Sequence, residues 1–227
     1  MSENTGFQFT DDAVPRAYEE VLVHRMFEPW AVLLLDACDL RPDAVVLDVA
    51  TGPGTVARLA ARRIGRGGRV VATDISRPML DAAALGEMRR ALKPGGQLAI
   101  AAWSHIEDNA FYAALHAALR ESVSRDLADR LLAPFNWPDA QVLKNTIEAA
   151  GFHQTQVRSK ALPLIFESGI AQAARALEAT PLAPSLATLP EGTQLKLKAA
   201  IGANLAPLLR DGKVSANMTS NIAVART

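Results

Sequence analysis

The stretch Val46-Leu-Asp-Val-Ala-Thr-Gly-Pro-Gly-Thr55 decides the fold. Its first half belongs to a short apolar run over 43–50, which is typical of a strand buried in a parallel sheet. Apolar residues then recur at helical spacing over 55–63. The glycines between strand and helix predict a tight turn that a ligand can approach closely. Because the first N–H groups of the following helix attract negative groups, we expect a cofactor site at this turn.

An acidic residue follows the next predicted strand. This strand covers 69–73 and ends at Asp74, 20 residues after Gly54. A carboxylate in that position can accept hydrogen bonds from both hydroxyls of a ribose. The turn and the acid together therefore predict a cofactor that contains a nucleoside.

The spacing of the turn also fits the dinucleotide fingerprint, as Gly52-x-Gly54-x-x-Ala57. That pattern is weak when it stands alone. Asp48 lies inside the strand end, and Pro53 stands where a pyrophosphate-binding loop needs a free N–H. Both details oppose an NAD-dependent reductase. The other alternative is a plain turn that binds no ligand. In that case the glycine turn, Asp48 and Asp74 would have to occur together by chance.

Composition and charge exclude several classes of protein. The chain has 227 residues, of which 24 are basic and 24 acidic. This balance provides no field that would gather nucleic acid or an anionic membrane. No apolar run reaches the ~18 residues of a membrane helix, and the single Cys38 excludes a disulfide framework. We expect a cytoplasmic protein with no nucleic-acid partner, no membrane partner and no metal site.

The rest of the chain alternates between helical and strand patterns, which predicts an α/β fold. Pro29 breaks the first helical region into two. The predicted helices cover 17–38, 78–92, 108–133, 139–151, 168–178 and 193–209, and the further strands cover 97–103, 155–166 and 220–225.

Four stretches of the chain resemble motifs of one enzyme family. Asp48-Val-Ala-Thr-Gly-Pro-Gly-Thr resembles its first motif, with Ala50 where a glycine is usual. Val71-Ala-Thr-Asp-Ile-Ser-Arg-Pro-Met-Leu resembles its second motif. Glu87-Met-Arg-Arg-Ala-Leu-Lys-Pro-Gly-Gly-Gln-Leu resembles a later helix, turn and strand, and Ala149-Ala-Gly-Phe resembles the helix end before the sixth strand. The family is that of the class I S-adenosylmethionine-dependent methyltransferases, and the likeness is closest to the small-molecule enzymes grouped with those of quinone biosynthesis.

The resemblance implies a transferase that uses S-adenosyl-L-methionine for methylation of a small-molecule acceptor. It implies that Asp48 and the turn hold the methionine end of the cofactor, and that Asp74 holds the ribose. Ile75 and Met79 would flank the adenine, and Tyr18 would help to close the site. The resemblance implies that the turn contacts the methionine end of the cofactor through Ala50, Thr51, Gly52 and Gly54.

A block of the family's fold is missing after the second motif. A strand–helix–strand block of ~30 residues or more normally stands there, but here Met79-Leu-Asp-Ala-Ala runs directly into Ala84-Leu-Gly-Glu-Met. The family's strand order is 3-2-1-4-5-7-6, and we expect it to shorten to 2-1-5-7-6, with strand 97–103 beside strand 44–49. We expect the deletion to lower cofactor affinity and turnover. The alternative function is a non-catalytic remnant, or a binding scaffold, of the same fold.

The predicted architecture is a single domain, 1–227, with a Rossmann-like doubly wound and mostly parallel sheet. It divides into a helical lid over 1–40, a cofactor-binding half over 41–103 and a substrate-side half over 104–227. His105 follows the third predicted strand, where active-site groups of open sheets gather. It is a candidate general base, and the alternative is an exposed loop histidine. Methyl transfer from a sulfonium depends mainly on alignment, so a catalytic triad is not required.

Overall fold

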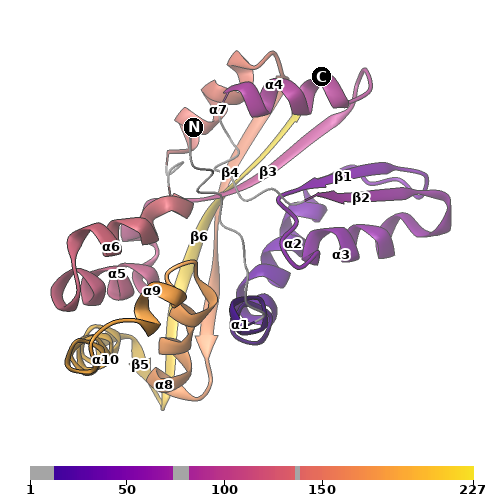
Figure 1. The fold of residues 1–227 in the computed structure, drawn as a ribbon. Helices are drawn as coiled ribbons and strands as arrows, with labels where there is room; N and C mark the ends of the chain where they lie inside the picture. The colour runs from indigo at the N-terminus through magenta and orange to yellow at the C-terminus, as the bar shows by residue number, and fades with distance from the viewer. Residues whose placement is uncertain (1–12, 74–81, 136–138) are drawn as a thin grey trace, which may run out of the picture.

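The computed structural model describes residues 13–73, 82–135 and 139–227, and these form an α/β fold (Figure 1). The α-helices are α1 (Ala13–Ala17), α2 (Glu28–Asp36), α3 (Thr55–Ile64), α4 (Ala82–Ala91), α5 (Ala110–Ser122), α6 (Arg125–Asp129), α7 (Ala140–Ala149), α8 (Gly169–Ala174), α9 (Ala183–Ala187) and α10 (Glu191–Leu205). A π-helix, η1, covers Tyr18–Phe27, and the 3-10 turns are η2 (Gly65–Gly67), η3 (Ile106–Asp108), η4 (Arg130–Phe135), η5 (Arg175–Ala179) and η6 (Ala206–Leu208). The strands are β1 (Val45–Val49), β2 (Arg69–Thr73), β3 (Gln97–Trp103), β4 (His153–Phe166), β5 (Leu209–Arg210) and β6 (Lys213–Arg226).

Strands β1 and β2 form a two-stranded parallel sheet, with Val45 opposite Arg69 and Val49 opposite Thr73. Helix α3 connects the two strands and packs on one face of the pair, as the crossover of a βαβ unit does. Its buried face contains Ala60 and Ile64, and the opposite face is rich in arginine. This unit carries the predicted cofactor turn.

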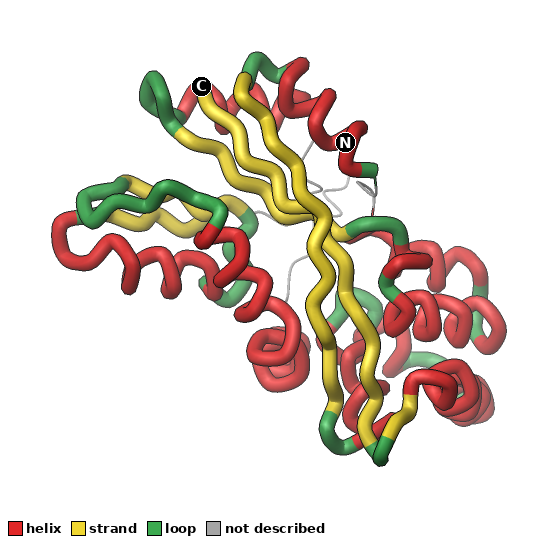
Figure 2. Tube along the Cα trace, turned by 180° about the vertical axis from the view of Figure 1, so that it is seen from behind, coloured by secondary structure: helices red, strands yellow, loops and turns green. Residues whose placement is uncertain are grey.

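The larger sheet has the order β3-β6-β4, and β5 forms a short hairpin with β6. Strand β6 runs antiparallel to both neighbours. It pairs with β3 only from Ser220 to Arg226, whereas its pairing with β4 extends from Val214 to Arg226. The far halves of β4 and β6 therefore continue past β3 as a two-stranded ribbon (Figure 2).

Two hydrophobic cores lie against the larger sheet. The smaller core joins α4 and α7 to the β3 end of the sheet, through Leu85, Leu143 and Ile147. The larger core lies around the ribbon and collects apolar side chains from the N-terminal helices, α5, α10 and the segment between α8 and α9. Phe111 of α5 and Phe166 of β4 meet in it with ring centroids 4.9 Å apart.

The predicted closure of the gap is wrong. Strands β1 and β2 pair as expected. The order β3-β6-β4 confirms the predicted order 5-7-6, in which β3 is the family's strand 5, β6 its strand 7 and β4 its strand 6. However, β3 does not pair with β1. The expected mostly parallel sheet is also wrong, because β1–β2 is the only parallel pair among the described strands. Figure 2 shows the two groups of strands as separate sheets.

The physical reason for the open arrangement lies in α2 and the loop after it. Trp30 of α2 packs edge-on against Trp103 at the end of β3, with ring centroids 5.4 Å apart. The backbone N–H of Asp39 donates a 2.9 Å hydrogen bond to the Gln97 side chain, and the Asp39 carboxylate pairs with Arg226. Side chains of α2 and its loop therefore attach the β1–β2 unit to β3, in place of a ladder between the strands.

The N-terminal helices are part of the larger core. Val21, Leu22 and Met26 of η1 and Trp30 of α2 are each at most 5% exposed. That these helices also cover a bound cofactor remains a prediction, but their apolar face packs on the ribbon and on η5. None of the helices in the described part of the chain is both long and apolar enough to span a membrane.

Candidate cofactor site

The glycine turn after β1 has a left-handed backbone at three positions. The φ angles are 60° at Ala50, 52° at Gly52 and 83° at Gly54. Glycine adopts such angles freely, whereas a residue with a side chain is strained there. Strain at a non-glycine residue is a feature of turns that bind ligands. A Cβ added to Gly52 would meet no atom within 4 Å, so this side of the turn faces open space.

Hydrogen bonds hold the turn against the end of β2. The Thr51 hydroxyl donates to the Asp48 carboxylate at 2.6 Å, and the Thr51 backbone N–H donates to the Thr73 carbonyl at 3.0 Å. The Thr73 hydroxyl donates to the Asp48 carbonyl at 3.3 Å. The carboxylate of Asp48 is thus oriented toward the turn, next to the strand end where the chain continues to Asp74.

The first turn of α3 is suited to an anionic group. Gly54 is the N-cap residue and brings no side chain to the free N–H groups, and the first turn contains no acidic residue. Thr55 is 7% exposed, and its hydroxyl has no hydrogen-bond partner among the residues that the structure describes. A buried hydroxyl without a partner costs free energy, so this position fits a site that a ligand completes.

Arg58 is a residue of the site that sequence reasoning missed. Its guanidinium folds back from α3 and donates to the carbonyl of Pro53, inside the turn. The same guanidinium forms a 3.8 Å ion pair with Glu19 of η1. The only signal in the sequence that could have indicated Arg58 is its spacing of four residues from Gly54. Residues four apart lie on the same face of a helix, so this spacing places Arg58 next to the turn.

The other predicted cofactor residues have different outcomes. Asp74, Ile75 and Met79 lie outside the described residues. Tyr18 stacks on Phe27 with ring centroids 4.6 Å apart and packs against the larger core, while the adjacent Glu19 reaches the turn through Arg58. The structure therefore brings the N-terminal helix to the turn, and a role of Tyr18 itself in closing the site stays a prediction.

His105 is exposed after the end of β3. Its carbonyl accepts a 2.8 Å hydrogen bond from the side chain of Asn109, which is fully buried and also accepts one from the backbone N–H of Thr219. These bonds fix the backbone of the loop against β6. The imidazole has no hydrogen bond in the described part of the structure, and its role as a general base stays a prediction.

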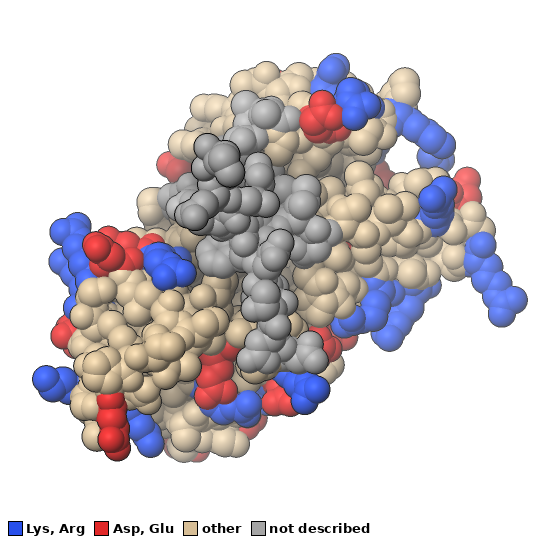
Figure 3. Space-filling view, in the orientation of Figure 1, with Lys and Arg blue, Asp and Glu red and all other residues tan. Residues whose placement is uncertain are grey.

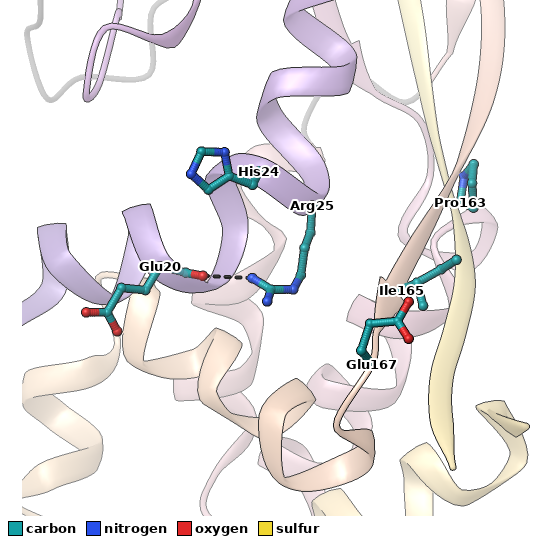
Figure 4. A pocket seen from close by; sticks show the side chains of 6 residues that line it. All are labelled: Glu20, His24, Arg25, Pro163, Ile165 and Glu167. Atoms are coloured by element: carbon teal, nitrogen blue, oxygen red, sulfur yellow. Dashed lines mark hydrogen bonds between the residues drawn. The ribbon is translucent and has the colours of Figure 1, made fainter. Parts of the chain in front are cut away.

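A pocket of about 390 Å³ lies between η1 and β4 (Figure 4). Its walls carry Glu20, His24, Arg25 and Glu167 over the apolar Pro163 and Ile165. Each of these polar side chains already has a partner: Glu20 pairs with Arg175, Glu167 with Lys213 and His24 with Glu28, and Arg25 donates to the Glu20 carbonyl. These side chains thus have partners within the protein, and we assign no ligand to this pocket.

On the face shown in Figure 3, basic and acidic side chains are interspersed. Within residues 13–73, 82–135 and 139–227, no group of three or more His, Cys, Asp or Glu side chains could hold a metal ion. The glycine turn remains the best-supported site.

Comparison with known proteins supports the same family. The chain is 47% identical over 66 residues to nocamycin O-methyltransferase of Saccharothrix syringae, a match that covers 29% of this chain and 24% of that enzyme. It is 40% identical over 58 residues to a ubiquinone/menaquinone biosynthesis C-methyltransferase of Hydrogenovibrio crunogenus, covering 26% and 22% of the two chains. These matches therefore span about a quarter of the length of each relative. No family model matches the chain.

Similarity of structure extends over almost the whole chain. The phosphoethanolamine N-methyltransferase 2 of Haemonchus contortus, solved with phosphomonomethylethanolamine and S-adenosylhomocysteine, superimposes on 97% of this chain and 58% of its own, with a TM-score of 0.53 and 14% identity. The fold is that of a class I methyltransferase. Among the described strands, β1 pairs only with β2.

Proposed function

We propose that this chain binds S-adenosylmethionine at the glycine turn and transfers its methyl group to a small-molecule acceptor. The observation that carries the proposal is the turn itself. It combines left-handed glycines, the Asp48 carboxylate held by Thr51, and an α3 N-terminus with an unpartnered Thr55 hydroxyl. Sequence similarity to two methyltransferases supports the same reading.

The residues present fit the amino-acid end of that cofactor. Asp48 supplies a carboxylate for an ammonium group, and the α3 N-terminus supplies N–H donors for a carboxylate. Gly52 leaves space for close approach of the ligand. Asp74 is proposed to accept the ribose hydroxyls, and Ile75 and Met79 to flank the adenine. When bound, the cofactor supplies a methyl group on a positively charged sulfur, which is already activated for transfer.

The protein's part in the reaction is then binding and alignment. The hydrogen bond from the Thr51 backbone N–H to the Thr73 carbonyl ties the glycine turn to the end of β2. We propose that this bond keeps the part of the site that binds the methionine end next to the part that binds the ribose. The N-terminal helices are proposed to exclude water from the site, because η1 reaches the turn through Glu19 and Arg58. His105 is the proposed base where the acceptor carries a proton.

The class of acceptor is proposed only as a small molecule. The relatives act, by name, at oxygen and at carbon, and the solved neighbour acts at nitrogen. The methylated atom therefore varies among these three proteins.

A second candidate function is a cofactor-binding or partner-binding scaffold without catalysis. The observation that favours it is the exposed face of β1, where Val45 is 64% and Leu47 is 47% exposed. In the family's fold, the missing block would supply the strand beside this one and the wall beside the methyl group. Without that wall, binding of the cofactor need not lead to transfer.

Calorimetry with S-adenosylmethionine, S-adenosylhomocysteine and NADH tests the proposal. We expect both S-adenosyl compounds to bind and NADH not to bind. Binding of neither S-adenosyl compound would exclude the methyltransferase and the cofactor-binding scaffold, and would leave only a partner-binding scaffold. Where binding occurs, restoring the missing block from a close relative separates the two candidates: a gain in methyl transfer favours an impaired enzyme, and no gain favours a scaffold.

A further inference from the structure

Two side chains of opposite charge flank the glycine turn. The Asp48 carboxylate lies at the β1 side, where it accepts the 2.6 Å hydrogen bond from Thr51. The Arg58 guanidinium lies at the α3 side, where it donates to the Pro53 carbonyl. An α-amino acid group carries one ammonium and one carboxylate, so this pair of charges matches it in number and sign.

The position of Arg58 is unusual for an arginine in the first turn of a helix. A cation is normally favoured at the C-terminus of a helix, because the N-terminal end already carries partial positive charge. Here the guanidinium bends back over that end, and a Cβ added to Gly54 would lie 3.8 Å from its Nη1 atom. The side chain is 50% exposed. Positive charge is therefore concentrated at one end of the turn and is open to a ligand.

Two contacts hold the guanidinium before a ligand arrives. The carbonyl of Pro53 orients it, and the Glu19 carboxylate lies 3.8 Å from its Nη2 atom. Exposed ion pairs of that length are weak. A bidentate carboxylate pairs with arginine far better, since the planar fork matches both oxygens. An incoming carboxylate can therefore displace Glu19 while the bond to Pro53 is kept.

We propose that Arg58 is a positioning residue that pairs with the α-carboxylate of the ligand, while Asp48 receives its α-ammonium group. This inference rests on the proposed function and adds to it the feature that recognises the amino-acid end. Thr55, one residue after Gly54, has a buried hydroxyl with no hydrogen-bond partner among the described residues. Arg58 fixes the orientation of the ligand along the turn and does not touch the transferred methyl group.

The test compares two ligands that differ at the amino-acid end. S-adenosylhomocysteine carries the α-carboxylate and the α-ammonium group, and 5′-methylthioadenosine carries neither. We expect Arg58→Gln to weaken binding of S-adenosylhomocysteine by about 10-fold, the scale of a lost hydrogen bond to a charged group. Binding of 5′-methylthioadenosine should stay within about twofold of wild type.

Matched variants separate this role from a structural one. Arg62→Gln makes the same change at an exposed position on α3, and it should leave both affinities unchanged. Arg58→Lys keeps the positive charge but lacks the planar guanidinium that can pair with both carboxylate oxygens. Its affinity should therefore lie between those of Arg58→Gln and wild type. Thermal unfolding of each variant shows that it is folded.

The outcomes are distinct. A loss confined to S-adenosylhomocysteine supports the inference. An equal loss for both ligands shows that Arg58 only supports the turn, and no loss shows that it does not meet the carboxylate; either result overturns the inference while the proposed function stands. Failure of the wild-type protein to bind either ligand overturns the proposed function and the inference together.

Discussion

The hydroxyl of Thr51 donates a 2.6 Å hydrogen bond to the carboxylate of Asp48, across the turn that joins β1 to α3. The bond holds the carboxylate toward the turn, so its loss would remove a contact that orients the proposed ammonium site. We predict that Thr51→Val lowers the affinity for S-adenosylhomocysteine by about 3- to 10-fold. It should cost at most ~1.5 kcal/mol of stability, the net value of an ordinary hydrogen bond. Calorimetry and urea unfolding measure the two effects.

The matched control for this change is Thr146→Val. Thr146 lies on α7 and donates to the Val142 carbonyl, far along the chain from the turn. We expect unchanged affinity in this variant. Equal loss of affinity in both variants would show that the Thr51–Asp48 bond has no specific part in binding.

The N-terminal helices should contribute to the stability of the whole fold. Leu22 of η1 is 2% exposed and lies in the larger core. Leu22→Ala should lower the free energy of unfolding by about 2–5 kcal/mol, the cost of a cavity in a packed core. Val32→Ala, at a position that is 37% exposed on α2, should cost far less. Urea unfolding measures both, and similar small costs would mean that the N-terminal helices are a loosely attached cover.

Much of the local structure could be predicted from the sequence. Strands β2 and β3 have the predicted bounds, because turn residues flank each apolar run closely. The predicted helix over 139–151 corresponds to α7, which Asp139 caps by accepting hydrogen bonds from the backbone N–H groups of Gln141 and Val142. The left-handed angles at Gly52 and Gly54 agree with the predicted tight turn.

The arrangement of the sheets could not be predicted. The pattern of apolar residues does not show which strand edges pair. The contacts that decide it are long-range side-chain contacts, such as Trp30 on Trp103 and Asp39 with Arg226. The length of β6 was also missed, although polar and apolar residues alternate over 213–219, where the strand pairs with β4 and, at its start, with β5. Arg58 was missed because an arginine in a helix normally indicates a solvated surface.

Burial should suppress the reactivity of the single cysteine. Desolvation raises the pKa of Cys38 to about 11, although the nearby Arg63 opposes the shift, and the thiol donates to the Leu34 carbonyl. The thiolate is the reactive form, so alkylation of the folded protein at pH 8 should be much slower than in urea. The rate should rise as the pH approaches 11.

The same shift has a consequence for stability. The unfolded chain loses the thiol proton near pH 8.5, while the folded chain keeps it up to about pH 11. The stabilisation is therefore complete below pH 8.5, and the free energy of unfolding should fall between these two values. Cys38→Ser should reduce this part of the pH dependence, and an unchanged profile would contradict the assignment.

The exposed face of β1 should favour association. Val45 and Leu47 point away from α3, next to a strand edge without a ladder partner in the described residues. Exposed apolar edge strands promote self-association. Leu47→Lys should reduce association measured by light scattering and change the free energy of unfolding by less than about 1 kcal/mol. Ile100→Lys, at a position 6% exposed in β3, should unfold the protein instead. Unfolding of the Leu47→Lys protein would show that this face is covered.

The most direct test of the account is calorimetric titration of S-adenosylhomocysteine into wild-type protein, Gly52→Ala and Gly52→Asp. Both substitutions place a side chain at a φ of 52°, with a shared backbone cost of about 1 kcal/mol, and the added Cβ meets no atom of the protein. Only the aspartate brings negative charge to the proposed carboxylate site. The account predicts binding to wild type, weaker binding to Gly52→Ala and none to Gly52→Asp. Equal binding to all three proteins would contradict the assignment of the cofactor to this turn.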